Sequence, residues 1–447
     1  MKIASSWAKR VDNRRAWHVE GHAWPRPVSL IGLAGVLSGC LLLTAPAASA
    51  TVTTNINSSS SGTLTLYSAD PADTAFYDTV LKPFEASNHV NIHLVAYPSS
   101  SFMEPFDAAV TSHTPLDILL ANGQNIRLMV QEHLLSPLNG VVPAGRFVTV
   151  APFTFGSQYY GAPVGGYYTG GVLYNKAIFA RYKLPVPRTF AAMKQDATQL
   201  NSHGIALLAF GGASVYNWPP FLMETIQQAS GDRPDQITLQ TLDTGKPPFT
   251  APIYVKAMTA LADLGKWGVF EPGWNGVDQN AGEALFTQGR AAMFYGGTWL
   301  LGPLSAEVHF PLGVERFPTY MTGVQSEPPG GPAFVAAIYH GTPKPLMGVA
   351  RKWVKYITSK TVDAELLRDE HLVNAADVGV TGPGANAVER MLSSYLPHTF
   401  TFLDWYWPPA VTTAMQHDIQ AVTGGAMSPV AALKQVQHIF VNVEKSG

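Results

Sequence analysis

Strand-like and helix-like segments alternate along most of this chain, and this order constrains its fold more than any other feature. The segment TLTLYSA from Thr63 predicts a strand, and residues 73–87 predict a helix in which Pro83 causes a kink or a break. Residues 90–98 predict a second strand, residues 102–110 a second helix, and LDILLANG a short buried strand. Such alternation predicts an α/β fold with a mostly parallel sheet covered by helices on both faces.

A second alternating block begins near Gly171. There GVLYNKAIFARY reads as a strand running into a helix, and GIALLAFGG reads as a buried strand. Thr189 is a good N-cap for the helix that follows the prolines of LPVPRTF, and Ser428 with Pro429 marks the start of the last helix. Two further helices are predicted from their inward stripes, which are Ile126, Met129, Val130 and Leu134, and Ala350, Trp353, Val354 and Ile357.

The bulk composition limits the classes of partner. A chain of 447 residues predicts two or three domains, and 46% hydrophobic residues suffice for a large core. The formal net charge is only −2, so the chain lacks the excess of positive charge that attracts nucleic acid. The single cysteine excludes both a disulfide within the chain and a cysteine-based zinc site.

The N-terminal segment has the pattern of an export signal. A basic flank precedes an apolar run that ends in small residues, which predicts an extracytoplasmic protein. Two processing sites remain open. LSGC, ending at Cys40, has the form of a lipidation site, whereas ASA, ending at Ala50, suits ordinary cleavage. Cys40 is thus either lipidated or a small hydrophobic residue of the signal core. Residues 51–62 are polar and predict a flexible tether.

The stretch ALFTQGRAAMFYGGTWLLG, residues 284–302, predicts a helix, a turn at Gln288–Gly289 and a strand that ends at Gly296–Gly297. Glycine allows a ligand to approach the backbone closely, and Trp299 follows at once. Trp299 therefore either contacts a ligand beyond the end of this strand or fills an interior position.

The same residues resemble the extracellular solute-binding proteins of ABC importers, in the branch that includes maltose-binding proteins. Four segments carry the resemblance, in order: YYGAPVGGYYTGGVLYNKAIFARYKLPVPRTF, LFTQGRAAMFYGGTW, ARKWVKYITS and SPVAALKQVQ. The resemblance implies a two-lobed, type II-like periplasmic-binding-protein fold, in which two doubly wound sheets are joined by hinge crossings. It also implies a monomer without cofactor that captures a sugar or oligosaccharide between the lobes and passes it to two membrane permease subunits and an ATPase.

The resemblance also sets the expected domain boundaries. Residues 1–50 form the signal, with an alternative end at Cys40, and residues 51–62 form the tether. Residues 63–171 with 308–358 form the first lobe, and residues 172–307 with 359–447 form the second. The membrane is reached only through an N-terminal lipid anchor, if Cys40 carries one.

Sugars stack on aromatic rings and need planar hydrogen-bonding groups for their hydroxyls, so we expect such residues at the strand ends. The predicted ligand contacts are Ser68, Asp70, Asn122, Gln124, Tyr168, Tyr216, Asn217, Trp218, Trp274, Gly297, Trp299, Asp404, Trp405 and Trp407. Asn125 is assigned to capping instead. For each aromatic residue, packing in the core is the alternative.

Other functions remain open at this point. A carbohydrate-active enzyme with two catalytic carboxylates leaves no short motif, although the chain lacks G-x-S-x-G, H-E-x-x-H and phosphate-binding glycine motifs. The pairs Tyr159–Tyr160 and Tyr167–Tyr168 suggest ferric iron as an alternative ligand. A polyol phosphate is a further alternative, but no cluster of Arg and Lys marks the predicted cleft.

Overall fold

A computed structural model describes residues 62–69, 74–97, 101–231, 234–301, 304, 307–369 and 386–446. The predicted export signal with Cys40, the tether up to residue 61, and Asp70 lie outside these residues.

The described part of the chain has eleven named strands. They are β1 (Thr63–Ser68), β2 (Asn91–Ala96), β3 (Ile118–Ala121), β4 (Thr154–Phe155), β5 (Gln158–Tyr159), β6 (Ala162–Asn175), β7 (Ala206–Ala209), β8 (Ala291–Gly297), β9 (Leu312–Glu315), β10 (Pro329–Ile338) and β11 (Phe400–Thr401).

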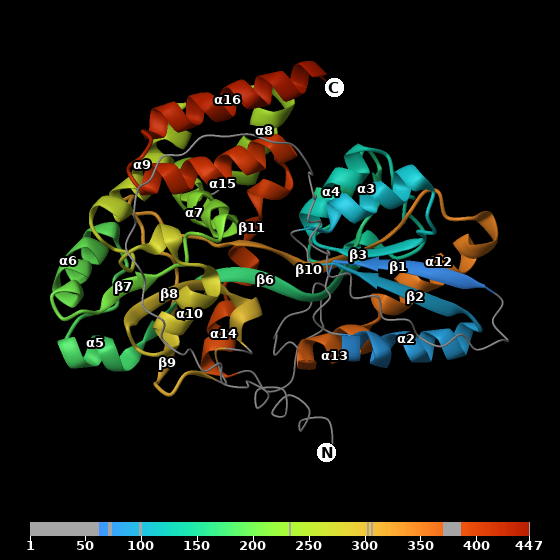
Figure 1. The fold of residues 1–447 in the computed structure, drawn as a ribbon, viewed down its shortest axis with the longest axis horizontal. Coiled ribbons are helices and arrows are strands. Elements are labelled where there is room, and N and C mark those ends of the chain that lie inside the picture. The colour runs from blue at the N-terminus through green and yellow to red at the C-terminus, as the bar shows by residue number, and fades with distance from the viewer. Residues whose placement is uncertain are drawn as a thin grey trace, which may run out of the picture. The chain divides into compact units, whose positions relative to one another are not determined.

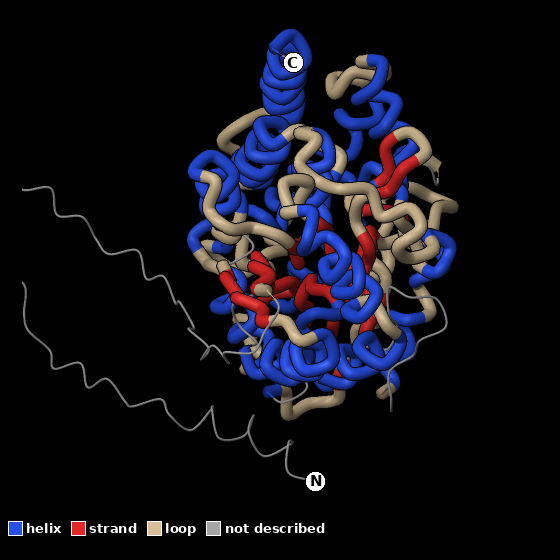
Figure 2. The backbone as a smooth tube through the Cα atoms, turned by 90° about the vertical axis from the view of Figure 1, so that its right-hand side faces the viewer, coloured by secondary structure: helices blue, strands red, loops and turns tan. Residues whose placement is uncertain are grey.

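The helices surround the strands (Figure 2). They are α2 (Thr74–Asn88), α3 (Met103–Ser112), α4 (Gly123–Gln131), α5 (Lys176–Tyr182), α6 (Phe190–Asn201), α7 (Trp218–Ser230), α8 (Pro234–Thr244), α9 (Pro252–Lys266), α10 (Gln279–Thr287), α12 (Lys344–Ile357), α13 (Lys360–Asp369), α14 (Ala387–Ser393), α15 (Pro409–Thr423) and α16 (Pro429–Ser446). Short 3-10 helices include η5 (Val215–Asn217), η7 (Thr298–Leu300) and η9 (Leu403–Trp405).

Two long strands join two groups of shorter ones. The main sheet has the order β2-β1-β3-β10-β6-β8-β7, with β9 on β6 and β11 on β10 (Figure 1). We call β1, β2 and β3 the first half-sheet, and β7, β8 and β9 the second half-sheet. The two expected sheets are thus continuous. Strand β10 pairs with β3 of the first half-sheet, β6 pairs with β8 and β9 of the second, and β6 and β10 pair with each other.

Both faces of each half-sheet are covered, as a doubly wound sheet requires. In β3, Ile118 and Leu120 enter a core with α2 and α12, whereas Leu119 and Ala121 enter a core with α3 and α4. In the second half-sheet, neighbouring residues of β8 and β6 likewise divide between two cores. Since successive strand residues point to opposite faces, this division explains why these strands read as unbroken apolar runs.

Helix α13 belongs to the core of the first half-sheet. Val362 and Leu366 pack there, and Asp363 accepts a hydrogen bond of 3.1 Å from the backbone N–H of Gly165. The expected lobe boundary lies at residue 358, but the chain continues to pack against the first half-sheet as far as Leu366.

The helix ends follow the predicted capping chemistry. Thr189 accepts a hydrogen bond of 3.1 Å from the N–H of Ala192, and Ser428 accepts one of 3.2 Å from Ala431. The expected inward stripe of α12 is buried, from Ala350 to Ile357. Pro83 does not end α2, which continues through it to Asn88.

Candidate functional site

The carboxyl ends of the two half-sheets point toward one stretch of β6. Val335 of β10 pairs both with Ala121, the last residue of β3, and with Pro163 of β6. Gly297, the last residue of β8, pairs with Gly170 of β6. Six residues of β6, Val164–Thr169, therefore separate the two ends, and we call them, with Gly330–Phe334 of β10, the seam. Ligands of open α/β sheets bind beyond such carboxyl ends.

A β-bulge interrupts the seam. Tyr167 pairs with Pro332 and Val164 pairs with Phe334, so β6 has one residue more than β10 between these pairs. Gly165, within the bulge, has φ +72°, a left-handed conformation that favours glycine. Because a bulge bends its strand, the crossing changes direction at the point where the buried carboxylate of Asp363 holds the Gly165 N–H.

Trp405 lies at the seam, from the C-terminal part of the chain. A Cβ placed on Gly331 would overlap its indole, and one placed on Gly123 would lie 2.5 Å from Cζ3. The ring is partly buried, with its centroid 6.0 Å from that of Phe153 and 5.4 Å from that of Phe402. Two glycines of the first half-sheet side thus leave space for one large aromatic side chain.

Three predicted polar contacts lie on the first half-sheet side of the seam. Ser68 ends β1 beside Leu120 and is buried. Asn122 caps α4 by accepting a hydrogen bond of 2.9 Å from the N–H of Asn125. Gln124 is partly buried, and its Nε2 donates a 3.5 Å bond to Oγ1 of Thr412 on α15. The structure thus gives Asn122 a capping role and brings Gln124 close to the C-terminal helices.

Asp404 precedes Trp405 in η9 and is electrostatically unusual. The residue is partly exposed, but its Oδ1 is buried and has no hydrogen-bond partner. Burial raises the pKa of this carboxyl to about 7, against the opposing effect of the backbone N–H groups of Asp404 and Trp405. A carboxyl group with these properties can accept or donate a hydrogen bond near neutral pH.

The turn after β8 also reaches the seam. Oγ1 of Thr298 accepts a hydrogen bond of 3.3 Å from the N–H of Thr169. Tyr168 is partly exposed and pairs with Gly331, so it lies at the centre of the seam. Trp299 lies within η7 directly after these residues, but its side chain lies outside the described part of the structure.

Two of the predicted aromatic contacts are core residues instead. Trp218 is fully buried, its ring centroid is 4.3 Å from that of Phe210, and its Nε1 donates a 3.0 Å bond to the carbonyl of Gly212. Trp407 is 2% exposed and belongs to the same core. The packing alternative therefore applies to both, because neither ring presents a free face.

The remaining candidates are Tyr216 and Asn217, in the loop after β7, and Trp274, which follows α9 and packs against that loop. Tyr216 is 55% exposed, and Trp274 is partly exposed with its ring against Trp218 at 5.3 Å. Asn217 is partly exposed and donates from Nδ2 to the carbonyl of Gly211 at 3.4 Å. Because β7 is parallel to β8, this loop leaves the same edge of the second half-sheet as the Gly297 turn.

The sequence reading did not single out Arg127 of α4. Its guanidinium lies 4.2 Å from the ring centroid of Phe155 and 5.7 Å from that of Tyr406, and Nη1 donates to the carbonyl of Pro152 at 3.1 Å. Burial lowers its pKa. A lone arginine on a helix carries no sequence signal for such a position, since both rings come from other segments.

Tyr159 and Tyr167, one residue of each tyrosine pair, are poorly suited to bind iron. The hydroxyl of Tyr159 donates to the carbonyl of Val142, and burial raises the pKa of Tyr167 to about 12, which opposes the phenolate that iron requires. Among the residues that the structure describes, no three His, Cys, Asp or Glu side chains are grouped closely enough to hold a metal ion.

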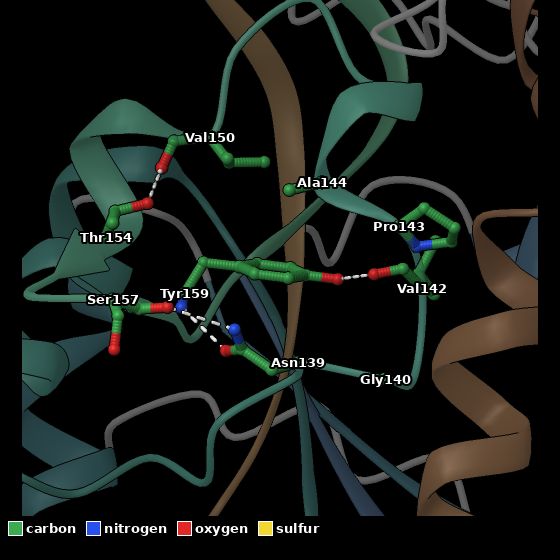
Figure 3. Close-up of a pocket in the computed structure, with 9 residues that line it drawn as sticks. All are labelled: Asn139, Gly140, Val142, Pro143, Ala144, Val150, Thr154, Ser157 and Tyr159. Atoms are coloured by element: carbon green, nitrogen blue, oxygen red, sulfur yellow. Dashed lines mark hydrogen bonds between the residues drawn. The ribbon is translucent and has the colours of Figure 1, made fainter.

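A pocket of about 340 Å³ has no residue of the seam in its lining (Figure 3). It is lined by Asn139, Gly140, Val142, Pro143, Ala144, Val150, Thr154, Ser157 and Tyr159. Its polar groups bond to one another: Asn139 donates to the carbonyl of Ser157 and accepts from the N–H of Tyr159, both at 3.1 Å. These groups are therefore engaged, and the seam remains the better candidate site.

Solved structures with the same fold are sugar-binding proteins. A chitin oligosaccharide binding protein shares 19% identity, covers 86% of this chain and 99% of its own, and has a TM-score of 0.76. The GacH receptor of Streptomyces glaucescens, solved with acarbose, shares 20% identity over 86% of this chain and 98% of its own, with a TM-score of 0.68. The maltose-maltodextrin binding protein of Alicyclobacillus acidocaldarius shares 20% identity, over 85% of this chain and 100% of its own, with a TM-score of 0.66.

Sequence comparison gives the family. A search of curated proteins found no significant match. The family model for bacterial extracellular solute-binding proteins matches residues 79–383, which include the seam and every strand of the two half-sheets except β1. The two-lobed α/β fold expected from the sequence is confirmed by these neighbours. The chain is therefore a member of the bacterial extracellular solute-binding protein family, whose location is extracytoplasmic.

Proposed function

We propose that this protein binds an uncharged sugar or oligosaccharide at the seam and delivers it to an ABC permease with its two membrane subunits and ATPase. The observation that carries the proposal is the convergence of β3 and β8 on the six residues Val164–Thr169. A ligand held there would contact both half-sheets at once, and it would favour their closed arrangement by contacting both. The sugar-binding proteins that share the fold support the ligand class.

The proposed contacts divide into rings and polar groups. Tyr216 is exposed, Trp405, Tyr168 and Trp274 are partly exposed, and Trp299 stays a proposed contact by its position after Gly297. Exposed ring faces stack against the C–H faces of sugars. Gln124, Asn217 and Asp404 are the proposed hydroxyl partners. Ser68 is proposed because it ends β1, and Asp70 because it follows that strand.

We propose that the ligand is neutral and that the protein releases it without chemical change. Arg127 is the one basic residue of α4, and its guanidinium contacts the rings of Phe155 and Tyr406 and donates to the Pro152 carbonyl. Such an arginine offers little to a phosphate, which prefers several charge-assisted donors. Incubation with oligosaccharides should therefore produce no shortened product, and the chain acts as a binding protein rather than an enzyme.

The proposed organisation of the mature protein follows from the N-terminal pattern. We propose export by residues 1–50, a lipid anchor if processing occurs at Cys40, and a monomer with two lobes, the first of which includes α13 in addition to the residues expected from the sequence. Within the described part of the chain, no helix combines the length and apolar character that crossing a membrane requires.

A thermal-shift screen tests the proposed function. The protein is heated with maltodextrins, chitin oligosaccharides, raffinose and acarbose, and with sorbitol phosphate and ferric citrate as comparison ligands. A ligand present at 100 times its Kd should stabilise the folded state by about 2.7 kcal/mol. We expect at least one neutral sugar to raise the melting temperature. A shift with only the phosphate or the iron complex would contradict the proposal.

A further inference from the structure

One exposed helix face carries a concentration of positive charge. Residues 344–360 contain Lys344, Arg351, Lys352, Lys355 and Lys360, and no Asp or Glu, although the whole chain has only 29 Lys and Arg. All five side chains are exposed. None of the ion pairs among the described residues involves them. We call these five residues the α12 basic face.

The helical period places this charge away from the core. Lys344, Arg351 and Lys355 are spaced by seven and four residues, so they project from one side of α12. Trp353, Val354 and Ile357 are buried on the opposite side, in the core of the first half-sheet. Lys352 flanks this row, and Lys360 begins α13. The charge serves no packing contact and faces solvent along the length of the helix.

The same helix lies where the described chain begins. A Cβ placed on Gly62 would lie 3.0 Å from Cδ2 of Leu346, and β1 starts at the next residue. Leu346 is only two residues beyond Lys344. The first turn of α12 thus lies beside the point where the N-terminal segment enters the described fold.

From this placement we propose that the α12 basic face binds anionic lipid headgroups at the outer surface of the cell membrane. Basic patches commonly strengthen the membrane attachment of proteins that also carry a lipid anchor. Basic side chains near an anionic surface contribute separately and are screened by salt. An exposed row of charges without an apolar groove suits a diffuse layer of headgroups. The inference rests on the extracytoplasmic location and does not depend on which ligand the seam binds.

Vesicle flotation tests the inference with the full chain. The parent, a K344Q/R351Q/K355Q variant and a K176Q/K256Q/K434Q control are mixed with phosphatidylcholine vesicles, with and without phosphatidylglycerol. The control removes the same charge from exposed lysines of other helices. Comparison with the parent cancels any binding through the N-terminal segment. We expect the α12 variant to lose roughly tenfold or more of its affinity for anionic vesicles at low salt, and the control to lose much less.

Three results would overturn the inference. The parent could bind both kinds of vesicle equally at low salt, or the control could lose as much affinity as the α12 variant. In the third, the α12 variant binds vesicles as well as the parent does, but its cross-linking to the permease is weaker. That result would assign the face to an acidic protein partner. Thermal shifts with sugar on the same variants separate this outcome from a failure of the proposed function, because the α12 basic face lies outside the seam.

Discussion

The indole of Trp405 lies against the backbone of Gly331, so that a Cβ on that glycine would overlap the ring. This contact joins the C-terminal part of the chain to the crossing strand β10, opposite Tyr168. A side chain that reaches the seam can contact a ligand that is bound between the two half-sheets. The relationship also makes the site testable by substitutions that add or remove very few atoms.

Gly331→Ala should displace Trp405 and weaken sugar binding. The added methyl group has no room, and overpacking of this kind costs about 1–3 kcal/mol. Gly348→Ala is the matched control, because no atom lies within 4 Å of its Cβ position on exposed α12. That change should leave sugar binding intact and add about 0.4–1 kcal/mol of stability. Urea unfolding and calorimetric titration measure both effects, and equal behaviour of the two variants would argue against a role for the contact.

Two tryptophans should separate stability from binding. Trp218→Ala removes a fully buried ring and should cost about 3–5 kcal/mol of unfolding free energy. Trp405→Ala removes a partly exposed ring and should lower sugar affinity more than stability. If Trp218→Ala does not fold, Trp218→Phe keeps most of the packing and should bind sugar with the parent's affinity. A Trp218→Phe protein that folds but binds poorly would return Trp218 to the site.

Glu224 should make the protein less stable as pH rises. This residue of α7 is 1% exposed, accepts a 2.7 Å hydrogen bond from Ser326, and has its pKa raised by burial to about 8. The native state therefore keeps a proton that the unfolded chain releases above its ordinary pKa near 4.3. The stabilisation is complete below that pH and is lost as pH rises through 8.

Glu224→Gln should flatten this part of the profile, because an amide does not titrate. Urea unfolding of both proteins between pH 5 and about 9 gives the difference, which also cancels the raised carboxyl pKa values of Asp196, Glu283 and Asp418. The variant should gain relative stability toward high pH. A difference that does not change with pH would show that Glu224 is ionised in the folded protein.

Asp404 should give sugar binding a pH dependence near neutrality. Its pKa is about 7, and an ionised carboxylate is the stronger acceptor for sugar hydroxyl groups. Affinity should therefore rise as pH increases through 7, and Asp404→Asn should abolish that rise. Titration calorimetry at several pH values measures it. Parallel profiles for the parent and the variant would exclude Asp404 from the site.

Much of the fold could be predicted from local pattern, because strand alternation and helix caps are local features. The buried stripe of α12 and the Thr189 cap are examples. The sequence predicted the strand β6 only from Gly171 onward and missed its first half. That half contains Gly165 and Gly166 and is held by pairing with β10, which is distant in sequence. Pro83 does not break α2, which packs on α12 and continues to Asn88, so only the predicted break is wrong.

The site was harder to predict, because an aromatic residue after a strand can point to either side. For Trp218 a signal was present. It starts α7 and shares the helical spacing of Phe221, Leu222 and Ile226, all of them buried. That spacing assigns it to the core. For Trp405 no local signal exists, since its neighbours Gly123 and Gly331 come from distant segments.

The central claim is that a neutral sugar binds at the seam between the two half-sheets. Titration calorimetry tests it most directly, with the sugar that gives the largest thermal shift added to the parent and to Trp405→Ala. We predict saturable binding of one sugar per parent chain and at least a tenfold weaker affinity for the variant, a loss of about 1.4 kcal/mol. Equal affinity of the two proteins, or no heat with any neutral sugar, would contradict the claim.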